Sequence, residues 1–200
     1  MQTTIYFVRH GKVYNPADIL YGRLPYFGLA QEGKKQIAQT AHYLKTQHID
    51  ILYSSPILRA KQSAMIIQEQ LGLPKIHFSK QLLEIQTSLQ GNSFTYIRSL
   101  NYDVFAGPGK KIVGETIYEV YNRVEKFVDY VIKNHAGKRV VAVTHGDLMM
   151  LLKAKFERLP IINESIRPGE NQYFTQGEVY KVTCDETTPL SLTSVFKPTL

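Results

Sequence analysis

The stretch "IYFVRHG" occupies residues 5–11 and places two basic side chains directly after a run of apolar residues. A continuous apolar run that is closed by a glycine is typical of a strand buried on both faces, as in a parallel sheet covered by helices. In such sheets, ligands bind in the crevice outside the carboxyl ends of the strands. The stretch therefore predicts that Arg9 and His10 stand at a ligand-binding edge. The alternative is an ordinary strand end that reaches solvent.

Further apolar runs alternate with segments of helical periodicity. Strands are predicted at 4–8, 50–55 and 139–145, and an antiparallel hairpin at 178–184 and 191–196 across the turn-rich "DETTP". Helices are predicted from about 31 to 47, from 55 to 72, within 114–138 and over 146–156. The alternation predicts one domain over residues 1–200, a three-layer α/β/α sandwich with a mostly parallel central sheet and an antiparallel edge.

The helix predicted to start at Ser55 has signals at both ends. Ser55 can cap it, Pro56 suits the first helical position, and Gly72 suits the residue that ends it.

Residues 86–112 break the alternation of strands and helices. They hold several turn formers together with the aromatic residues Phe94, Tyr96, Tyr102 and Phe105. We predict an irregular, partly helical lid insertion over the site, because four aromatic residues are many for a segment that covers nothing. A plain surface loop is the alternative.

Composition narrows the class of protein. The hydrophobic share is 44%, Cys184 is the single cysteine, and no apolar run approaches the length of a membrane span, about 18 residues. The first four residues lack the basic start and apolar centre of a signal peptide. We expect a cytoplasmic enzyme without a metal site, a cofactor or a membrane partner; a homodimer stays open. The net charge of +7 favours anionic partners, but the basic residues are spread along the chain, so we expect no nucleic-acid partner.

Charged side chains also follow the other predicted apolar segments. Arg59 comes one turn into the helix after the second strand, His145 closes a later strand, and Glu84 lies in "QLLEI". A helix N-terminus attracts anions, and an arginine there strengthens the attraction. Each residue alone has an ordinary explanation as a surface arginine, a capping carboxylate or a core histidine. Together with Arg9 and His10, they predict one site at one edge of the sheet.

The motifs that carry these residues resemble those of the histidine phosphatase superfamily, the phosphoglycerate mutase-like group. The resemblance runs from Ile5 to about Leu152 through "RHG", "YGRLPYFGLAQEGKKQ", "YSSPILRAKQSA", "LLEI", "GETIYEVYNRV" and "VTHGD". It implies that His10 is a nucleophile that forms a phosphohistidine, that Arg9, Arg59 and His145 bind the phosphate, and that Glu84 is the acid. It further implies substrate contacts for Asn15, Gly22 and Gly146, with Arg23 meeting a second anionic group. A surface turn around Gly22 and Pro25 is the alternative for Arg23.

The chemistry agrees with these residue types. Phosphoryl transfer to water needs a nucleophile, charge balance for three equatorial oxygens and a proton for the leaving oxygen. Permanently charged arginines lower the pKa of a neighbouring histidine and bind phosphate oxygens in pairs. Burial raises the pKa of Glu84 and nearby cations lower it, so its protonation state stays open.

Three departures from the family pattern bear on function. Lys12 and Val13 follow "RHG" where many relatives have Glu and Thr or Ser, and Ala30 stands where the first helix usually has a Ser or Thr cap. After Glu84 the sequence "IQTSLQGNSF" replaces the common continuation. The short chain and Asp147 after the second "HG" favour a phosphatase acting on a small phosphate ester over a mutase. A non-catalytic phosphate-binding module is a third hypothesis, and the substrate among phosphoglycerates, sugar phosphates, nucleotides and cofactor precursors stays open.

Overall fold

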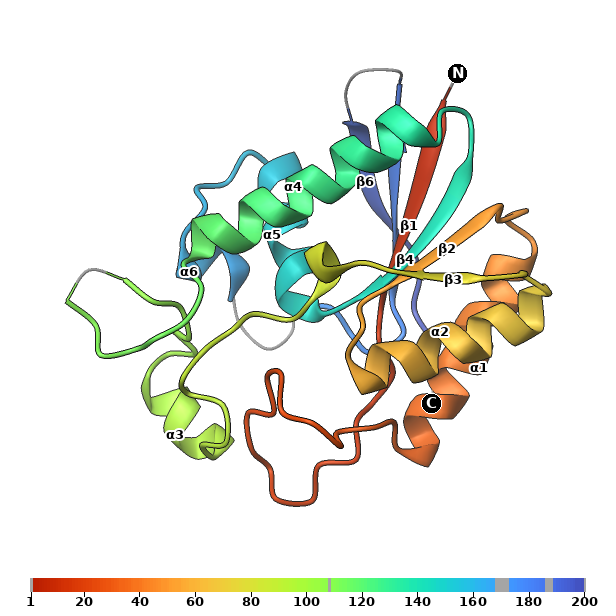
Figure 1. Ribbon diagram of the computed structural model, residues 1–200. Coiled ribbons are helices and arrows are strands. Elements are labelled where there is room, and N and C mark those ends of the chain that lie inside the picture. Colours follow the sequence, from red (N-terminus) through yellow and green to blue (C-terminus); the bar gives the residue numbers. More distant parts are fainter. Residues whose placement is uncertain (1, 108, 168–172, 186–188, 200) are drawn as a thin grey trace.

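The computed structural model describes residues 2–107, 109–167, 173–185 and 189–199, and six strands of this part form one sheet in the order β3-β2-β4-β1-β5-β6 (Figure 1). The strands are β1 Thr3–Arg9, β2 Ile51–Ser54, β3 Ile76–Phe78, β4 Arg139–Thr144, β5 Val179–Cys184 and β6 Pro189–Phe196. The first four strands are mutually parallel, whereas β5 is antiparallel to both β1 and β6. The predicted parallel sheet with an antiparallel edge is confirmed; residues 186–188 of the predicted hairpin turn lie outside the described residues.

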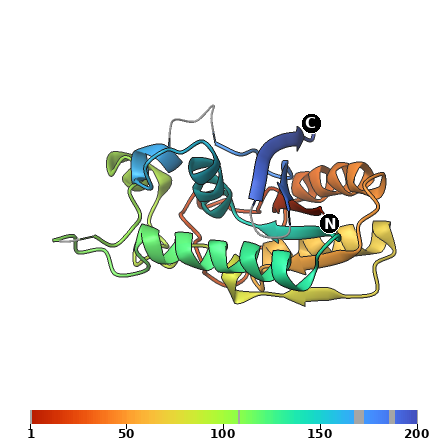
Figure 2. The same cartoon turned by 90° about the horizontal axis from the view of Figure 1, so that it is seen from above.

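Helices cover both faces of the sheet (Figures 1 and 2). They are α1 Gln31–Lys45, α2 Leu58–Leu71, the short 3-10 helix η1 Lys80–Leu82, α3 Phe94–Ser99, α4 Ile117–Asn134, α5 Gly146–Phe156 and α6 Asn163–Ile166. Successive side chains of β1 point to opposite faces. Ile5 and Phe7 belong to the core shared with α4 and α5, while Tyr6 and Val8 belong to the core shared with α1 and α2. The continuous apolar run of β1 therefore follows from burial on both faces.

The ends of the helices agree only in part with the sequence signals. Gly72 ends α2 in the left-handed conformation, with φ of 66°, as predicted. The predicted start is wrong, because α2 begins at Leu58 after an extended Ile57. The Ser55 hydroxyl lies 2.9 Å from His145 Nε2 and accepts from the backbone amide of Ile57 at 3.4 Å, so it caps no residue of α2. None of the helices in the described part of the chain combines the length and the apolar character that a bilayer span needs.

The segment 86–112 contains α3, and residue 108 within it is not described. Its first part is joined to the loop after β1 by backbone hydrogen bonds. Gly91 N donates to Leu20 O at 2.8 Å, Leu20 N to Asn92 O at 2.8 Å, and Phe94 N to Asp18 O at 2.9 Å. The two segments lie side by side beyond the carboxyl ends of the parallel strands (Figure 1). Closure of this segment as a lid stays a prediction.

Candidate active site

The carboxyl ends of three parallel strands lie at the edge where the predicted site residues meet. His10 follows β1, Ser55 follows β2 and His145 follows β4, and neighbouring registers place these ends in one row. Arg59 is the second residue of α2, so the turn after β2 carries it back over this edge. The topology therefore brings together side chains that lie far apart in the sequence.

Arg59 links the two histidines. Its Nε lies 3.1 Å from His10 Nε2, and its Nη2 lies 3.1 Å from His145 Nδ1. The two imidazole rings meet edge to face with their centroids 5.2 Å apart. All three side chains are shielded from solvent. A permanently charged guanidinium between two buried imidazoles makes the centre cationic even when both imidazoles are neutral.

His10 is held in one tautomer. Its Nδ1 lies 2.8 Å from the carbonyl oxygen of Gly11, which can only accept a hydrogen bond, so Nδ1 carries the proton. Burial, followed by the charges of Arg59 and Arg9, lowers the pKa of His10 well below its ordinary value. The ring is therefore neutral, and its unprotonated Nε2 accepts a hydrogen bond from Arg59 Nε in the cationic centre.

Glu84 reaches the same centre from the segment after η1. Its Oε2 lies 3.7 Å from Arg59 Nη2 and 3.6 Å from His145 Nδ1. Burial, helped by the negative charge of Asp147, raises the pKa of Glu84 to about 7, although Arg59 opposes the shift. Burial therefore outweighs the nearby cations in setting the pKa of Glu84. Glu84 exchanges a proton close to neutral pH, which suits a general acid and base.

Three buried guanidinium nitrogens have no hydrogen-bond partner among the described residues. They are Arg59 Nη1, Arg9 Nε and Arg167 Nε. A buried donor without a partner costs about 1–3 kcal/mol, and the oxygens of an anion can supply the missing acceptors. Cationic donors beside a neutral imidazole are the arrangement that a phosphate dianion requires.

The remaining predicted residues take different places. Arg9 lies at the border of the centre, with its guanidinium 5.0 Å from the Tyr173 ring and its Nη1 donating to the carbonyl of Phe174. The carbonyl of Gly22 accepts from Arg59 Nη2 at 2.9 Å. Gly146 is the first residue of α5, next to His145. The amide of Asn15 closes its own loop by donating to the Ile19 carbonyl at 2.9 Å.

Arg23 points inward rather than toward solvent. Its Nε donates to the backbone carbonyl of Glu84 at 2.7 Å, and its Nη2 donates to Glu115 Oε2 at 2.7 Å. Its Nη1 meets Gln86 Oε1 at 3.3 Å. This placement favours a structural use of the guanidinium over the predicted contact with a second anionic group.

Comparison with known proteins agrees with this geometry. Residues 5–188 match the model of the histidine phosphatase superfamily (branch 1). The chain belongs to this superfamily. The resemblance in the sequence motifs is thus confirmed, and the residues that carry those motifs are the ones that meet around Arg59.

The relatives of this histidine phosphatase include named phosphatases. Phosphoserine phosphatase 1 of Hydrogenobacter thermophilus is 30% identical over 152 residues, which are 69% of this chain and 68% of the relative. An uncharacterized protein of Mycobacterium tuberculosis, Rv0525, is 30% identical over 72% of this chain and 73% of its own. The structure of the mycobacterial glucosyl-3-phosphoglycerate phosphatase Rv2419c is similar in fold, with a TM-score of 0.77 at 21% identity over 97% of this chain and 98% of that one. The chain is a phosphate-monoester hydrolase of this family.

Sequence reasoning missed several groups in this histidine phosphatase site. The ring of Tyr21 lies 4.7 Å from the Arg59 guanidinium. Asp147 is buried, accepts from Tyr173 Oη at 2.5 Å and pairs with Arg167 Nη2 at 2.7 Å. In the sequence, Asp147 distinguishes the chain from mutases. Its position in the first turn of the helix that follows His145 is the signal that would also place its carboxylate in the site.

Proposed function

We propose that this chain hydrolyses monoesters of small phosphorylated metabolites through a covalent phosphohistidine on His10. The observation that carries the proposal is the unprotonated Nε2 of His10, which accepts a hydrogen bond from Arg59 Nε at 3.1 Å and becomes available as a nucleophile when a phosphate oxygen takes over that donor. A neutral nucleophile beside fixed cations can accept a phosphoryl group whose charge those cations balance.

In the first step, His10 Nε2 forms a bond to phosphorus while the bond from phosphorus to the ester oxygen breaks. Glu84, whose pKa of about 7 keeps much of it protonated at neutral pH, donates its proton to the departing oxygen. In the second step, the Glu84 carboxylate takes a proton from water as that water attacks the phosphorus. The bond from phosphorus to Nε2 then breaks, and inorganic phosphate and the starting enzyme are regenerated.

The remaining basic groups act on the phosphoryl oxygens. Arg59 uses Nε and Nη2 to contact the two imidazoles. Its Nη1 has no partner among the described residues and is available to an equatorial oxygen. Arg9 Nε is the second unpartnered donor. His145 lies across the centre from His10 and supplies a further polar contact. Asn15, Gly22 and Gly146 are proposed to contact the substrate close to its phosphate group.

The identity of the ester is best tested with a panel of phosphate monoesters. The panel includes phosphoserine and a glucosylated phosphoglycerate, because relatives are named for these two substrates. Release of inorganic phosphate is measured with and without a bisphosphorylated primer. Turnover without primer supports hydrolysis, whereas strict dependence on primer with no free phosphate supports the mutase reaction.

We also propose a cytoplasmic location and no nucleic-acid partner.

The nucleophile is tested by His10→Ala. We expect turnover to fall by more than about a thousandfold while the far-UV circular dichroism spectrum is unchanged, because a covalent acceptor has no substitute at that position. Quenching the parent enzyme with denaturant at alkaline pH after mixing with labelled substrate should trap a phosphoenzyme that is stable to base and labile to acid, and that His10→Ala lacks. Residual activity within about tenfold of the parent would remove His10 from this role.

A further inference from the structure

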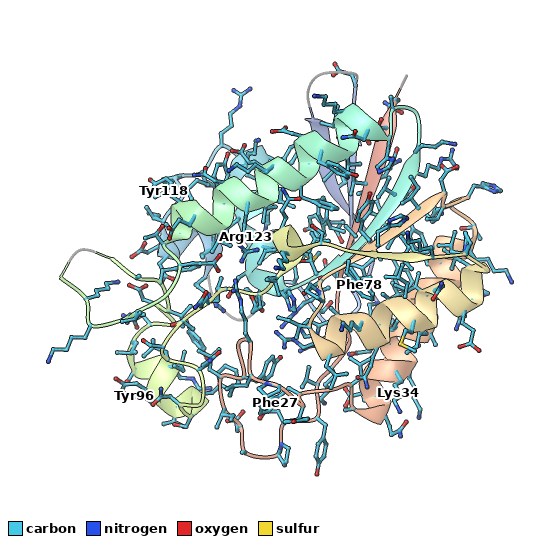
Figure 3. All side chains as sticks on the ribbon, in the orientation of Figure 1. Phe27, Lys34, Phe78, Tyr96, Tyr118 and Arg123 are labelled. Atoms are coloured by element: carbon cyan, nitrogen blue, oxygen red, sulfur yellow. The ribbon has the colours of Figure 1, made fainter. Side chains whose placement is uncertain are left out.

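Glu115 lies outside the cationic centre and joins two arginines. It stands between Gly114 and Thr116, the residue that caps α4. Glu115 Oε1 accepts from Arg123 Nε at 2.8 Å, and its Oε2 accepts from Arg23 Nη2 at 2.7 Å. The three side chains are largely shielded, with 19% of Glu115, 15% of Arg123 and 23% of Arg23 exposed. Figure 3 shows Arg123 on the side of α4 that faces the rest of the molecule.

Both arginines end on the same backbone atom. Arg23 Nε donates to the carbonyl oxygen of Glu84 at 2.7 Å, and Arg123 Nη2 donates to it at 3.2 Å. Arg123 Nη1 also holds the carbonyl of Gln81 at 2.8 Å. Glu84 follows η1 and belongs to no helix or strand, so side chains rather than a regular backbone ladder fix its main chain.

The segment after Glu84 is tied to Glu115 as well. Gln86 N donates to Glu115 Oε2 at 2.9 Å, and Glu115 N donates to Gln86 O at 2.8 Å. A Cβ at Gly114 would stand 2.0 Å from that same Gln86 oxygen, so only glycine permits this approach. The backbone on the far side of Glu84 is therefore clamped against the start of α4.

We propose that Glu115, Arg23 and Arg123 form a positioning network that holds Glu84 in place for proton transfer to the leaving group. Among the described residues, the hydrogen bonds of these three side chains reach the backbone of Glu84 and none reaches the side chain of His10, Arg59 or His145, although the charge of Arg123 helps to lower the pKa of His145. This inference rests on the proposed function of Glu84 as the acid. It also gives Arg23 a role different from the contact with a second anion that the sequence predicts.

The dependence of the hydrolysis rate on the leaving group separates a displaced Glu84 from a general loss of stability. A poor leaving group such as the serine alkoxide of phosphoserine needs the proton from Glu84, whereas p-nitrophenolate departs without it. Loosening Glu84 should therefore slow hydrolysis of the alkyl ester and spare the aryl ester. Damage to the phosphate centre would slow both.

The experiment compares kcat/KM for phosphoserine, or the best alkyl ester of the panel, with that for p-nitrophenyl phosphate. We expect Glu115→Gln to lower kcat/KM on the alkyl ester by about tenfold or more and on p-nitrophenyl phosphate by less than about threefold. Glu84→Gln is the reference and should show the same selectivity more strongly. The matched control is Glu125→Gln, which removes a carboxylate of α4 whose partners among the described residues are Lys155 and Tyr121 rather than the backbone of Glu84. Both esters should be unaffected in the control.

Loss of the Glu115 carboxylate leaves the guanidinium groups of Arg23 and Arg123 to repel each other, which could disturb more than Glu84. A second pair of variants therefore changes Arg23, in the loop between β1 and α1, and keeps Glu115. Arg23→Gln should show the same selective loss, and Arg23→Lys should restore part of the alkyl activity by supplying one donor. Equal losses on both esters, or none, in the soluble Glu115 and Arg23 variants overturn the positioning proposal. If Glu84→Gln itself lacks selectivity, the acid role in the proposed function fails instead.

Discussion

Burial acts on the two reacting side chains of the site in opposite senses. It lowers the pKa of His10 well below the ordinary value and raises that of Glu84 to about 7, because in each case it disfavours the charged form. Below about pH 7 both groups are therefore neutral in the free enzyme. A neutral imidazole and a protonated carboxyl are the two forms that the first step uses.

The pH dependence of the first step follows from the pKa of Glu84. As pH rises through about 7, Glu84 loses the proton it must donate, so kcat/KM on an alkyl ester should fall about tenfold per pH unit above that point. Toward acid, activity should persist through pH 6, because His10 stays neutral there. A pH series in matched ionic strength measures both limbs. The prediction fails if kcat/KM is flat from pH 6 to pH 9, or if Glu84→Gln keeps the basic limb.

At the scale of residues, the sequence predicts which charged groups meet at the phosphate centre. It does not predict that Arg23 and Arg123 both pair with Glu115. His10, Arg59, Glu84 and His145 each follow an apolar segment, and sheet topology brings such ends together. Arg23 and Glu115 are separated by 92 residues. Both residues lie in loops, and their pairing depends on the paths of those loops, which no periodicity encodes.

At the scale of elements, α1 and α4 begin in contrasting ways. Thr116 and Glu119 form a capping box at α4, in which each side chain accepts from the backbone N–H of the other. Ala30 stands at the N-cap of α1 with extended dihedral angles, φ −69° and ψ 164°, and offers no side-chain acceptor. The backbone of α1 is thus arranged for a cap that its sequence does not provide.

Ala30→Ser should therefore stabilise the protein. A serine hydroxyl at this position can accept from an amide of the first turn, which is worth about 0.5–1 kcal/mol. Thr116→Ala should lower the free energy of unfolding by about 1 kcal/mol, since it removes an existing cap. Chemical denaturation of the three proteins measures both changes. An unchanged or lower stability of Ala30→Ser would show that the α1 terminus is satisfied in another way.

The start of α2 shows where local signals fail. The order Ser55-Pro56 predicts a cap and a first helical residue, but Ser55 lies against His145 and the helix begins at Leu58. The tertiary contact outweighs the cap, which is worth only about 1 kcal/mol. Strands β1, β2 and β4 were predictable because their burial on both faces of the sheet appears directly as apolar runs, whereas the short and only partly buried β3 was not among the predicted strands.

At the scale of the whole molecule, the charge arrangement bears on metal dependence. In the described residues no cluster of three or more His, Cys, Asp and Glu side chains has a metal-binding arrangement. Arg59 occupies the space between the two histidines, 3.1 Å from a ring nitrogen of each, so its charge repels a cation there.

Hydrolysis should therefore survive chelation. After incubation with excess EDTA and removal of metals, kcat/KM should stay within about twofold of the untreated enzyme. Added Mg²⁺ or Zn²⁺ should not increase it. Loss of activity on chelation, with recovery when either metal is restored, would contradict the mechanism.

The backbone bonds between residues 18–20 and 91–94 also have a consequence for protein engineering. The two loops behave as a short two-stranded ribbon, in which each supplies the acceptors for the other. Exchanging one loop for that of a relative would leave amides of its neighbour without acceptors, whereas exchanging both together would preserve the ribbon. The two segments should therefore be transplanted as a pair, although they lie about 70 residues apart in the sequence.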